Sequence, residues 1–470
     1  MDGRDTLKSL SQNSKELIYS AAPYWLQNII LNLESFRIHK RRYSKKYVET
    51  YKNISENTFL SKRDLTNYQE AMLRSFLKSA ADTHFWSDKF RLYKLNIEAK
   101  DCLQEIKKLP ILSKKEVKEN IDKIVNKKFL SLNNYSFAHT SGTTGSGLIF
   151  PQTNHMEQVT WATWWRYRNV HNISNKNLCG YFGGRKILKT RQTTTPFWIK
   201  SHPLNQLFFS GYHINADNVQ SYLEAIVRHQ ITWLHGYPSL LSWVVKLARD
   251  KKLNYEFPAL KIITTGAENL TIWQRENIST FFNAPVREHY GQAEGVANFS
   301  ECKNGFLHVD EDFSLVEFIQ EDFELHQIIG TNWNNYAFPL IRYRTDDLVN
   351  LGEKTCSCGN NGRIIDSVLG RSEDYIVKPN GTRIGRLDHI FKDIVNISEA
   401  QIYQKDLNNI EVRIVKLPEF SQDDYKLITE QIKKYLGSEL SFEIVTFTQI
   451  PRSSNNKLKF VISDLDNNQS

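Results

Sequence analysis

The chain has few cysteines and no long apolar run. Only five cysteines are spread over 470 residues, and a sparse, odd-numbered set does not build a disulfide framework, which favours a reducing compartment. No run reaches the roughly 20 apolar residues that a transmembrane helix needs. The opening, MDGRDTLKSLSQNSKEL, lacks the basic start and apolar core of a signal peptide. We therefore expect a cytoplasmic protein.

The composition is that of a globular chain with a moderate excess of positive charge. Lysine and arginine number 61 against 52 aspartates and glutamates, which gives a net charge of +9. Such a balance suits a nucleotide, a nucleic acid or a membrane surface. The sequence shows no interleaving of basic and aromatic residues of the kind found in RNA-binding sheets, so we expect no nucleic-acid partner. The length predicts two or more domains.

The pattern of apolar residues changes twice along the chain. Residues 1–100 read as helical, and a further helix is predicted over 113–125 with Ser113 as its N-cap. From about 135 to 370, short apolar runs alternate with amphipathic helices, which predicts a mainly parallel sheet covered by helices. A boundary near 370 precedes a compact α+β unit.

The predicted fold is therefore α/β. We expect a large N-terminal domain of mixed and parallel sheets layered with helices, followed by a small, mobile α+β domain. The boundaries predicted for these parts are 1–100 for a helical segment of the large domain, 101–369 for its core and 370–470 for the small C-terminal lid domain.

An N-terminal segment has two interpretations. Residues 21–33 are apolar with scattered amides, and residues 37–47 are strongly basic. A helix of this kind could rest on an anionic membrane surface, which would make the protein membrane-peripheral. It could equally pack on its own domain with a solvated basic face, the interpretation that we favour.

A loop rich in glycine and hydroxyl groups, TSGTTGSG at 140–147, follows a predicted strand. Its glycines would let the backbone approach a phosphate, and its hydroxyls and amides would donate hydrogen bonds. It lacks the lysine of a Walker P-loop and the spacing of a dinucleotide fingerprint. Taken alone, it is equally well explained as a plain surface loop.

Five motifs in order resemble those of the adenylate-forming superfamily, which includes acyl-CoA synthetases and peptide-synthetase adenylation domains. The resemblance covers roughly residues 105–460, and its motifs run over 140–147, 290–294, 343–347, 370–374 and 451–457. Within the superfamily the chain is most similar to phenylacetate–CoA ligase-like proteins, and more narrowly to relatives associated with capsule and O-antigen polysaccharide genes. HGYPSLL, TTGAENL, EHYGQAEG and CSCGNNGRI carry that narrower resemblance.

The resemblance implies ATP-dependent activation of a carboxylic acid as an acyl-adenylate, with ATP and Mg²⁺ bound and pyrophosphate released. Lys457 would bridge carboxylate and phosphate oxygens, Glu294 would bind Mg²⁺, and Asp347 would hold the ribose with Arg371 nearby. Glu373 would be the hinge of the small domain. The remaining nucleotide-binding residues implied are Ser141, Gly142, Thr143, Thr144, Gly145, Gly266, Ala267, Glu288, His289, Tyr290 and Gly291.

Several positions depart from the superfamily pattern. Ala293 stands where relatives have threonine, and Asp346 and Asn456 stand where they have glycine. None of these changes removes a charge that the reaction needs. The two glycine replacements leave open whether the loops keep their geometry, and they support an alternative function as a catalytically weak scaffold in polysaccharide assembly.

Four residues form a candidate metal site. Cys302 and His308 are followed by the pair Cys356 and Cys358, and three thiols with one imidazole suit a tetrahedral structural zinc. Phenylacetate–CoA ligase-like proteins look similar here. The alternative is a set of unrelated thiols.

The sequence does not identify the acid or the acceptor. The acid pocket is predicted near the aromatic and polar residues of three predicted loops, and it would take a small or sugar-linked acid. The acceptor would be CoA or an amine on an amino acid or sugar, and the oligomeric state is open. The predicted pocket residues are Tyr181, Arg185, Tyr212, His213, His235, Gly236 and Tyr237.

Overall fold

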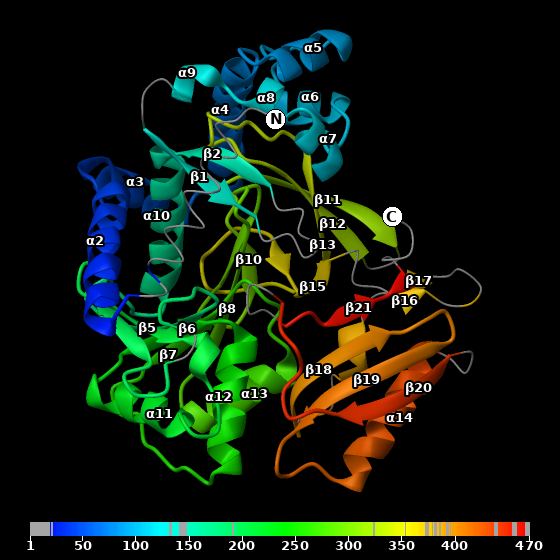
Figure 1. The fold of residues 1–470 in the computed structure, drawn as a ribbon. Helices are drawn as coiled ribbons and strands as arrows, with labels where there is room; N and C mark the ends of the chain where they lie inside the picture. The colour runs from blue at the N-terminus through cyan, green and yellow to red at the C-terminus, as the bar shows by residue number, and fades with distance from the viewer. Residues whose placement is uncertain are drawn as a thin grey trace. The chain divides into compact units, whose positions relative to one another are not determined.

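The structure is a computed structural model of the whole chain (Figure 1). It describes residues 19, 22–130, 134–140, 148–189, 192–322, 325–352, 354–371, 376–377, 379, 383–384, 387–391, 394, 396–436, 440–453 and 458–465. The chain forms two compact units, each built from separate stretches of sequence. The first comprises 1–39, 175–286 and 375–470, and the second comprises 40–174 and 287–374.

The first unit contains a largely parallel sheet of five strands in the order β7-β6-β3-β5-β4. Strands β3, β5, β6 and β7 pair in parallel, and β4 is the antiparallel edge. Helices α11, α12 and α13 pack on it through one apolar cluster. The elements are β3 (Cys179–Gly183), β4 (Trp198–Ser201), β5 (Gln206–Ser210), η2 (Gly211–His213), α11 (Val219–Arg228), β6 (Trp233–Gly236), α12 (Pro238–Asp250), β7 (Ile262–Thr265) and α13 (Ile272–Phe282).

The C-terminal part of the first unit is a four-stranded sheet in the order β20-β19-β18-β21, covered on one face by α14. Ile428 and Ile432 of α14 share a buried cluster with Ile402 and Val412 of the sheet, so the amphipathic period of the helix explains its placement. The elements are β16 (Ile376–Val377), β17 (Arg383–Ile384), η3 (Leu387–Phe391), β18 (Ile397–Gln404), β19 (Asn409–Lys416), α14 (Gln422–Leu436), β20 (Ser441–Thr446) and β21 (Val461–Ser463).

The second unit combines helices, most of them before β1, with antiparallel strands. The helices are α3 (Lys45–Asn57), α4 (Lys62–Ala80), α5 (His84–Leu92), α6 (Cys102–Glu105), η1 (Ile106–Lys108), α7 (Lys114–Glu119), α8 (Ile121–Ile124), α9 (Lys127–Leu130) and α10 (Asn154–Val170). Helix α2 (Tyr24–Arg42) precedes them and lies mainly in the first unit. No helix among the described residues is both long and apolar enough to cross a membrane.

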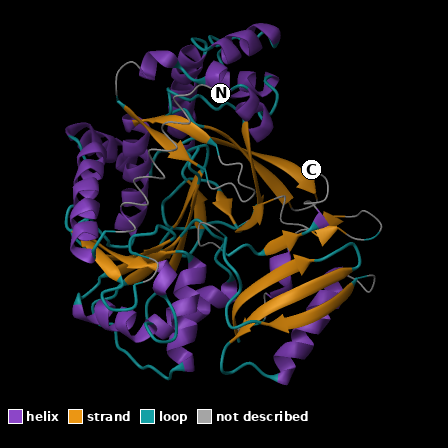
Figure 2. Cartoon of the chain, in the orientation of Figure 1, coloured by secondary structure: helices purple, strands orange, loops and turns teal. Residues whose placement is uncertain are grey.

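The strands of the second unit pair almost wholly antiparallel (Figure 2). One sheet has the order β14-β10-β9-β8, a second has the order β11-β12-β13-β15, and β1 pairs with β2. The strands are β1 (Tyr135–His139), β2 (Ile149–Thr153), β8 (Val286–Gly291), β9 (Asn298–Glu301), β10 (Leu307–Val309), β11 (Leu315–Asp322), β12 (Leu325–Thr331), β13 (Tyr343–Asn350), β14 (Ile364–Ile365) and β15 (Ser367–Arg371).

The predicted fold class is confirmed: the molecule is α/β, with large sheets and helices followed by a smaller α+β part. Ser113 caps a helix as predicted, because its side chain accepts a hydrogen bond from the Glu116 N–H. The single helix predicted over 113–125 is wrong, since the chain leaves helical geometry at Asn120 (φ −125°) and two short helices form. The domain boundaries near 100 and 370 stay a prediction.

Candidate functional site

Part of the predicted site lies outside the described residues. These positions are Ser141, Gly142, Thr143, Thr144, Gly145, Glu373 and Lys457. Arg371 is the last residue of β15, and its backbone pairs with Asp347 in the antiparallel register of β13 and β15. That pairing places two predicted nucleotide-binding positions opposite each other on neighbouring strands.

The carboxylate of Asp347 is held by two side chains from the end of β8. The Tyr290 hydroxyl donates to Asp347 Oδ2 over 2.6 Å, and Gln292 Nε2 donates to the same oxygen over 2.7 Å. Gln292 Nε2 also donates to the Tyr290 hydroxyl over 2.8 Å, which closes a triangle. Burial and the adjacent Asp347 raise the pKa of Tyr290 well above its ordinary value, so the phenol keeps the proton that it donates.

A bulge in β13 aims Asp347 at this triangle. The register between β12 and β13 shifts between Gln327 and Ile329, and Asp346 adopts φ +62° there. This is the left-handed conformation that glycine takes freely and that aspartate tolerates better than most residues. The neighbouring Thr345 hydroxyl accepts from the Asp347 N–H over 3.1 Å. The replacement of glycine by Asp346 is therefore accommodated by the backbone.

Glu294, the predicted Mg²⁺ ligand, is buried at the end of the motif over 290–294. The Tyr343 hydroxyl donates to Glu294 Oε1 over 3.4 Å, and Asn332 Nδ2 donates to the Glu294 carbonyl over 3.0 Å. The side chain and the backbone of this residue are thus both fixed from β13 and from the turn after β12.

His289 belongs to a series of hydrogen-bonded polar side chains in the second unit. Its Nε2 is 2.9 Å from Asn298 Oδ1, which also accepts from the Trp164 indole over 3.0 Å. The ring packs near Trp164, with the two centroids 5.2 Å apart. Removal of the ring from water and the nearby Arg168 charge lower the pKa of His289 to about 3, so the ring is neutral at physiological pH.

Two further motif positions surround this histidine. The backbone N–H of Glu288 donates to Glu301 Oε2 over 2.6 Å, which ties β8 to β9. At Gly291, a Cβ would come within 2.9 Å of Asn298 Oδ1 and 3.1 Å of His289 Cε1. A side chain there would disturb the contact between His289 and Asn298, which explains the glycine.

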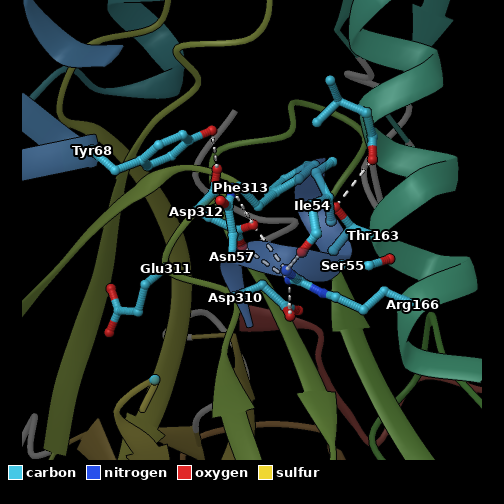
Figure 3. Close-up of polar contacts among 12 residues, drawn as sticks. Ile54, Ser55, Asn57, Tyr68, Thr163, Arg166, Asp310, Glu311, Asp312 and Phe313 are labelled. Carbon is cyan, nitrogen blue, oxygen red and sulfur yellow. Dashed lines mark hydrogen bonds and ion pairs between the residues drawn. The ribbon is translucent and has the colours of Figure 1, made fainter. Parts of the chain in front are cut away.

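The chain of polar contacts ends at a buried arginine that the sequence analysis did not single out (Figure 3). Arg166 of α10 donates to Asp310 over 2.8 Å, to Asp312 over 2.8 and 2.9 Å, and to the Ile54 carbonyl over 2.7 Å. Asp310 also accepts from Asn298 over 2.6 Å. Burial alone would lower the pKa of Arg166, but Asp312 and Asp310 outweigh it and raise that pKa.

In the first unit, the register of the parallel sheet places predicted pocket residues in one row. Tyr181 pairs with Phe208 on one side and with His235 on the other, and His235 pairs with Thr264. The Tyr181 ring lies 5.7 Å from the His235 ring, and His235 Nδ1 lies 2.8 Å from Thr264 Oγ1. Gly266 and Ala267 follow β7, with Ala267 in the left-handed region at φ +67°. The row stands near the carboxyl ends of the strands, where α/β sheets bind ligands.

Loops at this edge are held by other predicted residues. The Tyr212 hydroxyl donates to the Gly184 carbonyl over 3.0 Å. Both ring nitrogens of the buried His213 are engaged, at 2.7 Å from Ser210 Oγ and 2.9 Å from the Lys189 carbonyl. This is the bonding of a structural histidine, and its contact with substrate stays a prediction. Gly236 ends β6, and Arg185 is exposed.

Glu268 is another residue that the sequence did not reveal. Its carboxylate accepts from the Ser239 N–H at the start of α12 over 3.1 Å, and from the Leu458 N–H over 3.2 Å. Leu458 directly follows Lys457 in the sequence. Together with burial and Tyr181, Glu268 helps to raise the pKa of Tyr237 to about 12.

The four predicted zinc ligands do come together. One ligand atom from each of Cys302, His308, Cys356 and Cys358 lies within 4.8 Å of the others. The two sulfurs of Cys302 and Cys356 are 3.6 Å apart, and Cys358 Sγ is 3.5 Å from His308 Nε2. For a tetrahedral zinc with bonds of about 2.3 Å, ligand atoms stand roughly 3.8 Å apart.

The surroundings of the cluster fit a metal as well. His308 Nδ1 lies 3.1 Å from the Gly362 carbonyl, which needs the proton on Nδ1 and turns the lone pair of Nε2 toward the sulfurs. The Asn304 amide and the Asn360 N–H each lie 3.5 Å from a cluster sulfur. These donors suit thiolate sulfurs and support the donor set chemically.

The sequence is similar to one family model and to two known proteins. Residues 376–464 match the family model described as the CapK C-terminal domain. The chain is 26% identical over 458 residues to Protein CapK of Staphylococcus aureus, which covers 95% of this chain and 99% of that protein. It is 23% identical over 260 residues to the phenylacetate-coenzyme A ligase of Thermus thermophilus, covering 48% of this chain and 58% of that enzyme.

The fold of the chain is similar to that of solved CoA ligases. A 2-hydroxyisobutyryl-CoA ligase in its postadenylation state, in complex with 2-HIB-AMP, matches with a TM-score of 0.66 at 15% identity, over 87% of this chain and 91% of that one. The same ligase with 2-HIB-AMP and CoA, in the thioesterification state, matches with a TM-score of 0.52 at 16% identity, over 88% and 93%. Sequence and fold together confirm the resemblance carried by the motifs: this chain is similar in sequence to CapK and to phenylacetate–coenzyme A ligase, and it has the fold of these solved CoA ligases.

Proposed function

We propose that the protein is an AMP-forming ligase. It would use ATP to activate a carboxylic acid as an acyl-adenylate, release pyrophosphate, and pass the acyl group to CoA or to an amine. The observation that carries this proposal is the triangle of Tyr290, Gln292 and Asp347. Its two donors hold the Oδ2 atom of the Asp347 carboxylate in place, so a ribose diol would bind this side chain at little conformational cost.

Gln292 adds a second element to the same site. Its Oε1 is buried and has no hydrogen-bond partner within the described part of the chain. A buried acceptor without a partner costs free energy, and a hydroxyl or amino group of the nucleotide would satisfy it. We therefore propose that both residues accept hydrogen bonds from the nucleotide, Gln292 through its amide oxygen and Asp347 through its carboxylate.

The remaining roles follow the motifs. In the first half-reaction, a carboxylate oxygen of the acid attacks the α-phosphorus of ATP, and the bond to pyrophosphate breaks. Such a step is accelerated chiefly by positioning and by stabilising charge on the phosphates. We propose that Lys457 and the 141–145 loop stabilise the charge on the phosphates, and that Glu294 would hold Mg²⁺. In the second half-reaction, a thiol or amine attacks the acyl carbon and AMP leaves.

We further propose that Cys302, His308, Cys356 and Cys358 hold a structural zinc. All four ligand positions would come from protein, which leaves no open position for substrate, so the metal would cross-link the β9–β10 hairpin to the loop before β14. The neutral Nε2 of His308 and the three sulfurs would be the ligands. No step of the proposed reaction uses this metal.

The class of acid is proposed from the row of Tyr181, His235 and Thr264. Two aromatic rings and a hydroxyl suit a small acid with both an apolar and a polar part. The resemblance of the sequence motifs to capsule-associated relatives favours an acid linked to surface polysaccharide synthesis, such as a sugar-linked acid, an amino acid or a short acyl group.

The experiment is a pyrophosphate-release assay with ATP and Mg²⁺. Pools of aryl acids, short fatty acids, amino acids and uronic acids are tested, each with and without CoA. The proposal predicts release that depends on one pool, and a further rise with CoA or an amine would identify the acceptor. Silence in every pool, together with no binding of ATP by calorimetry, would contradict it and leave a scaffold role.

A further inference from the structure

The exposed face of α2 has the opposite pattern to that of an ordinary surface helix. The buried residues of the helix include Gln27 and Ser35, whereas Trp25, Leu33 and Phe36 are exposed by 62%, 60% and 58%. Surface helices normally turn their apolar side chains inward and their polar ones outward. An apolar stripe that is left facing water marks a surface that contacts something else.

The exposed apolar residues form one continuous stripe. At about 100° per residue, Trp25, Ile29, Leu33 and Phe36 fall within one narrow sector of the helix. Ile30 flanks the stripe and is exposed as well. Gln27, Leu31 and Ser35 fall on the opposite side. The helix is drawn in blue in Figure 1.

The inner face of α2 is firmly attached, so the stripe cannot simply rotate inward. Leu31 packs in a buried cluster with Ile187 and Ile199. The Tyr24 hydroxyl donates to the Trp198 carbonyl over 3.1 Å. Asn32 donates to the Lys200 carbonyl and accepts from the His202 N–H, both over 3.0 Å. These contacts fix which face of the helix points outward.

Basic residues continue the stripe toward the C-terminal end of α2. Arg37 and Lys40 fall in or beside the same sector and are both exposed. The acid nearest in sequence, Glu34, lies on the flank, and its oxygen is 3.8 Å from Arg37 in a solvent-exposed pair. Exposed pairs of this kind bind weakly, so Arg37 can exchange Glu34 for another anion.

We propose that α2 is a docking helix for an anionic membrane surface. Its stripe would lie in the boundary between headgroups and acyl chains, where Trp and Phe are enriched, while Arg37 and Lys40 would contact lipid phosphates. Charge argues for lipid over a second copy of the chain. A symmetric pairing through α2 would bring the cations of two copies, each carrying +9, close together.

This inference is independent of the proposed ligase activity. It proposes that the protein works at the surface of a membrane. No described helix could span a bilayer, so the contact would be peripheral and reversible. A ligase held at a membrane would have direct access to lipid-linked acceptors and would also retain access to soluble ones.

The test is vesicle flotation of the full-length protein. Phosphatidylcholine vesicles with and without phosphatidylglycerol are compared for the wild type and for Leu33→Glu. Leu92→Glu is the matched control, because Leu92 is also a strongly exposed leucine but lies on α5. We expect binding to the anionic vesicles, a loss of at least about tenfold for Leu33→Glu, and no loss for Leu92→Glu.

Charge-reversal variants and a measurement of the oligomeric state complete the experiment. Arg37→Glu combined with Lys40→Glu should weaken flotation and reduce its dependence on salt. An unchanged melting temperature shows that each variant is folded. Failure of the wild type to float, or equal flotation of Leu33→Glu, would overturn the proposal. So would a wild-type dimer that Leu33→Glu dissociates in light scattering, because the stripe would then belong to a second copy.

Discussion

Tyr290 donates its hydroxyl proton to the carboxylate of Asp347 over 2.6 Å, although the two residues are 57 positions apart in the sequence. They belong to motifs that sequence alone treats as separate. The contact joins the end of β8 to the bulge of β13, and Gln292 bonds to both partners. Asp347 is therefore fixed by the protein and does not depend on ligand for its orientation.

The first prediction concerns nucleotide affinity. Asp347→Ala removes the proposed charged acceptor of the ribose diol and should weaken ATP binding by roughly 10- to 100-fold, because hydrogen bonds to charged groups contribute about 1.5–3 kcal/mol. Gln292→Leu should weaken it by about tenfold. Asp366→Ala removes an exposed carboxylate paired with Lys354 and should have no effect. Calorimetry measures all three, and equal affinity of Asp347→Ala and Asp366→Ala would refute the ribose contact.

The second prediction concerns Arg166. Replacement by methionine leaves Asp310 and Asp312 buried without their cation, which typically costs about 3–5 kcal/mol. Arg166→Lys should recover only part of this, because lysine lacks the planar fork that bonds two carboxylates at once. Arg91→Met breaks only an exposed pair with Asp88 and should change stability by less than about 0.5 kcal/mol. Urea denaturation compares them, and similar midpoints for Arg166→Met and Arg91→Met would contradict the structural role.

The third prediction is a pH dependence. Above about pH 6.5 a histidine is neutral in both the folded and the unfolded chain, so His289 contributes nothing there. As the pH falls below that value, the unfolded chain takes up a proton that the folded chain refuses until about pH 3. Stability is therefore lost on acidification, by about 1–2 kcal/mol from this residue at pH 5.

A neutral replacement isolates that contribution. His289→Gln keeps a donor toward Asn298 and removes the titrating ring. The loss of stability between pH 7.5 and pH 5, measured by urea denaturation at each pH, should be smaller in this variant than in the wild type. An identical loss in the two proteins would show that His289 is protonated as easily in the folded chain as in the unfolded one.

The fourth prediction is one zinc per chain. Elemental analysis of protein purified without chelator should find about one zinc per chain, and Cys358→Ser should lower that content and the melting temperature. Cys102→Ala is the control, because Cys102 is buried in a separate apolar cluster and burial raises the pKa of its thiol to about 11. A wild type that is free of metal and melts at the same temperature as Cys358→Ser would end the claim.

Local signals in the sequence predicted local structure well. The serine before 114–119 caps its helix, and the strands and helix of the C-terminal part follow the period of their apolar residues. The substitution of glycine by Asp346 had left the loop geometry open. The left-handed backbone at that residue shows how aspartate can stand there.

Contacts between distant segments could not be predicted in the same way. Arg166 lies 144 and 146 residues from the two aspartates that it binds, and no local pattern marks any of the three. Gln292 and Glu268 were likewise hidden, because an amide or an acid after a strand is common. Helix α2 does pack on its own domain as expected, but through its more polar face, since carbonyls of β4 accept hydrogen bonds from the Tyr24 hydroxyl and the Asn32 amide.

The central claim is that a carboxylate oxygen of the substrate becomes bonded to the α-phosphorus of ATP. The most direct test is to supply ¹⁸O-labelled carboxylic acid with ATP, Mg²⁺ and CoA or an amine, and to analyse the nucleotide product by mass spectrometry. Formation and cleavage of an acyl-adenylate predict AMP that carries one ¹⁸O atom, and no such AMP from Lys457→Ala. Unlabelled AMP, or ADP with label in inorganic phosphate, would contradict the account.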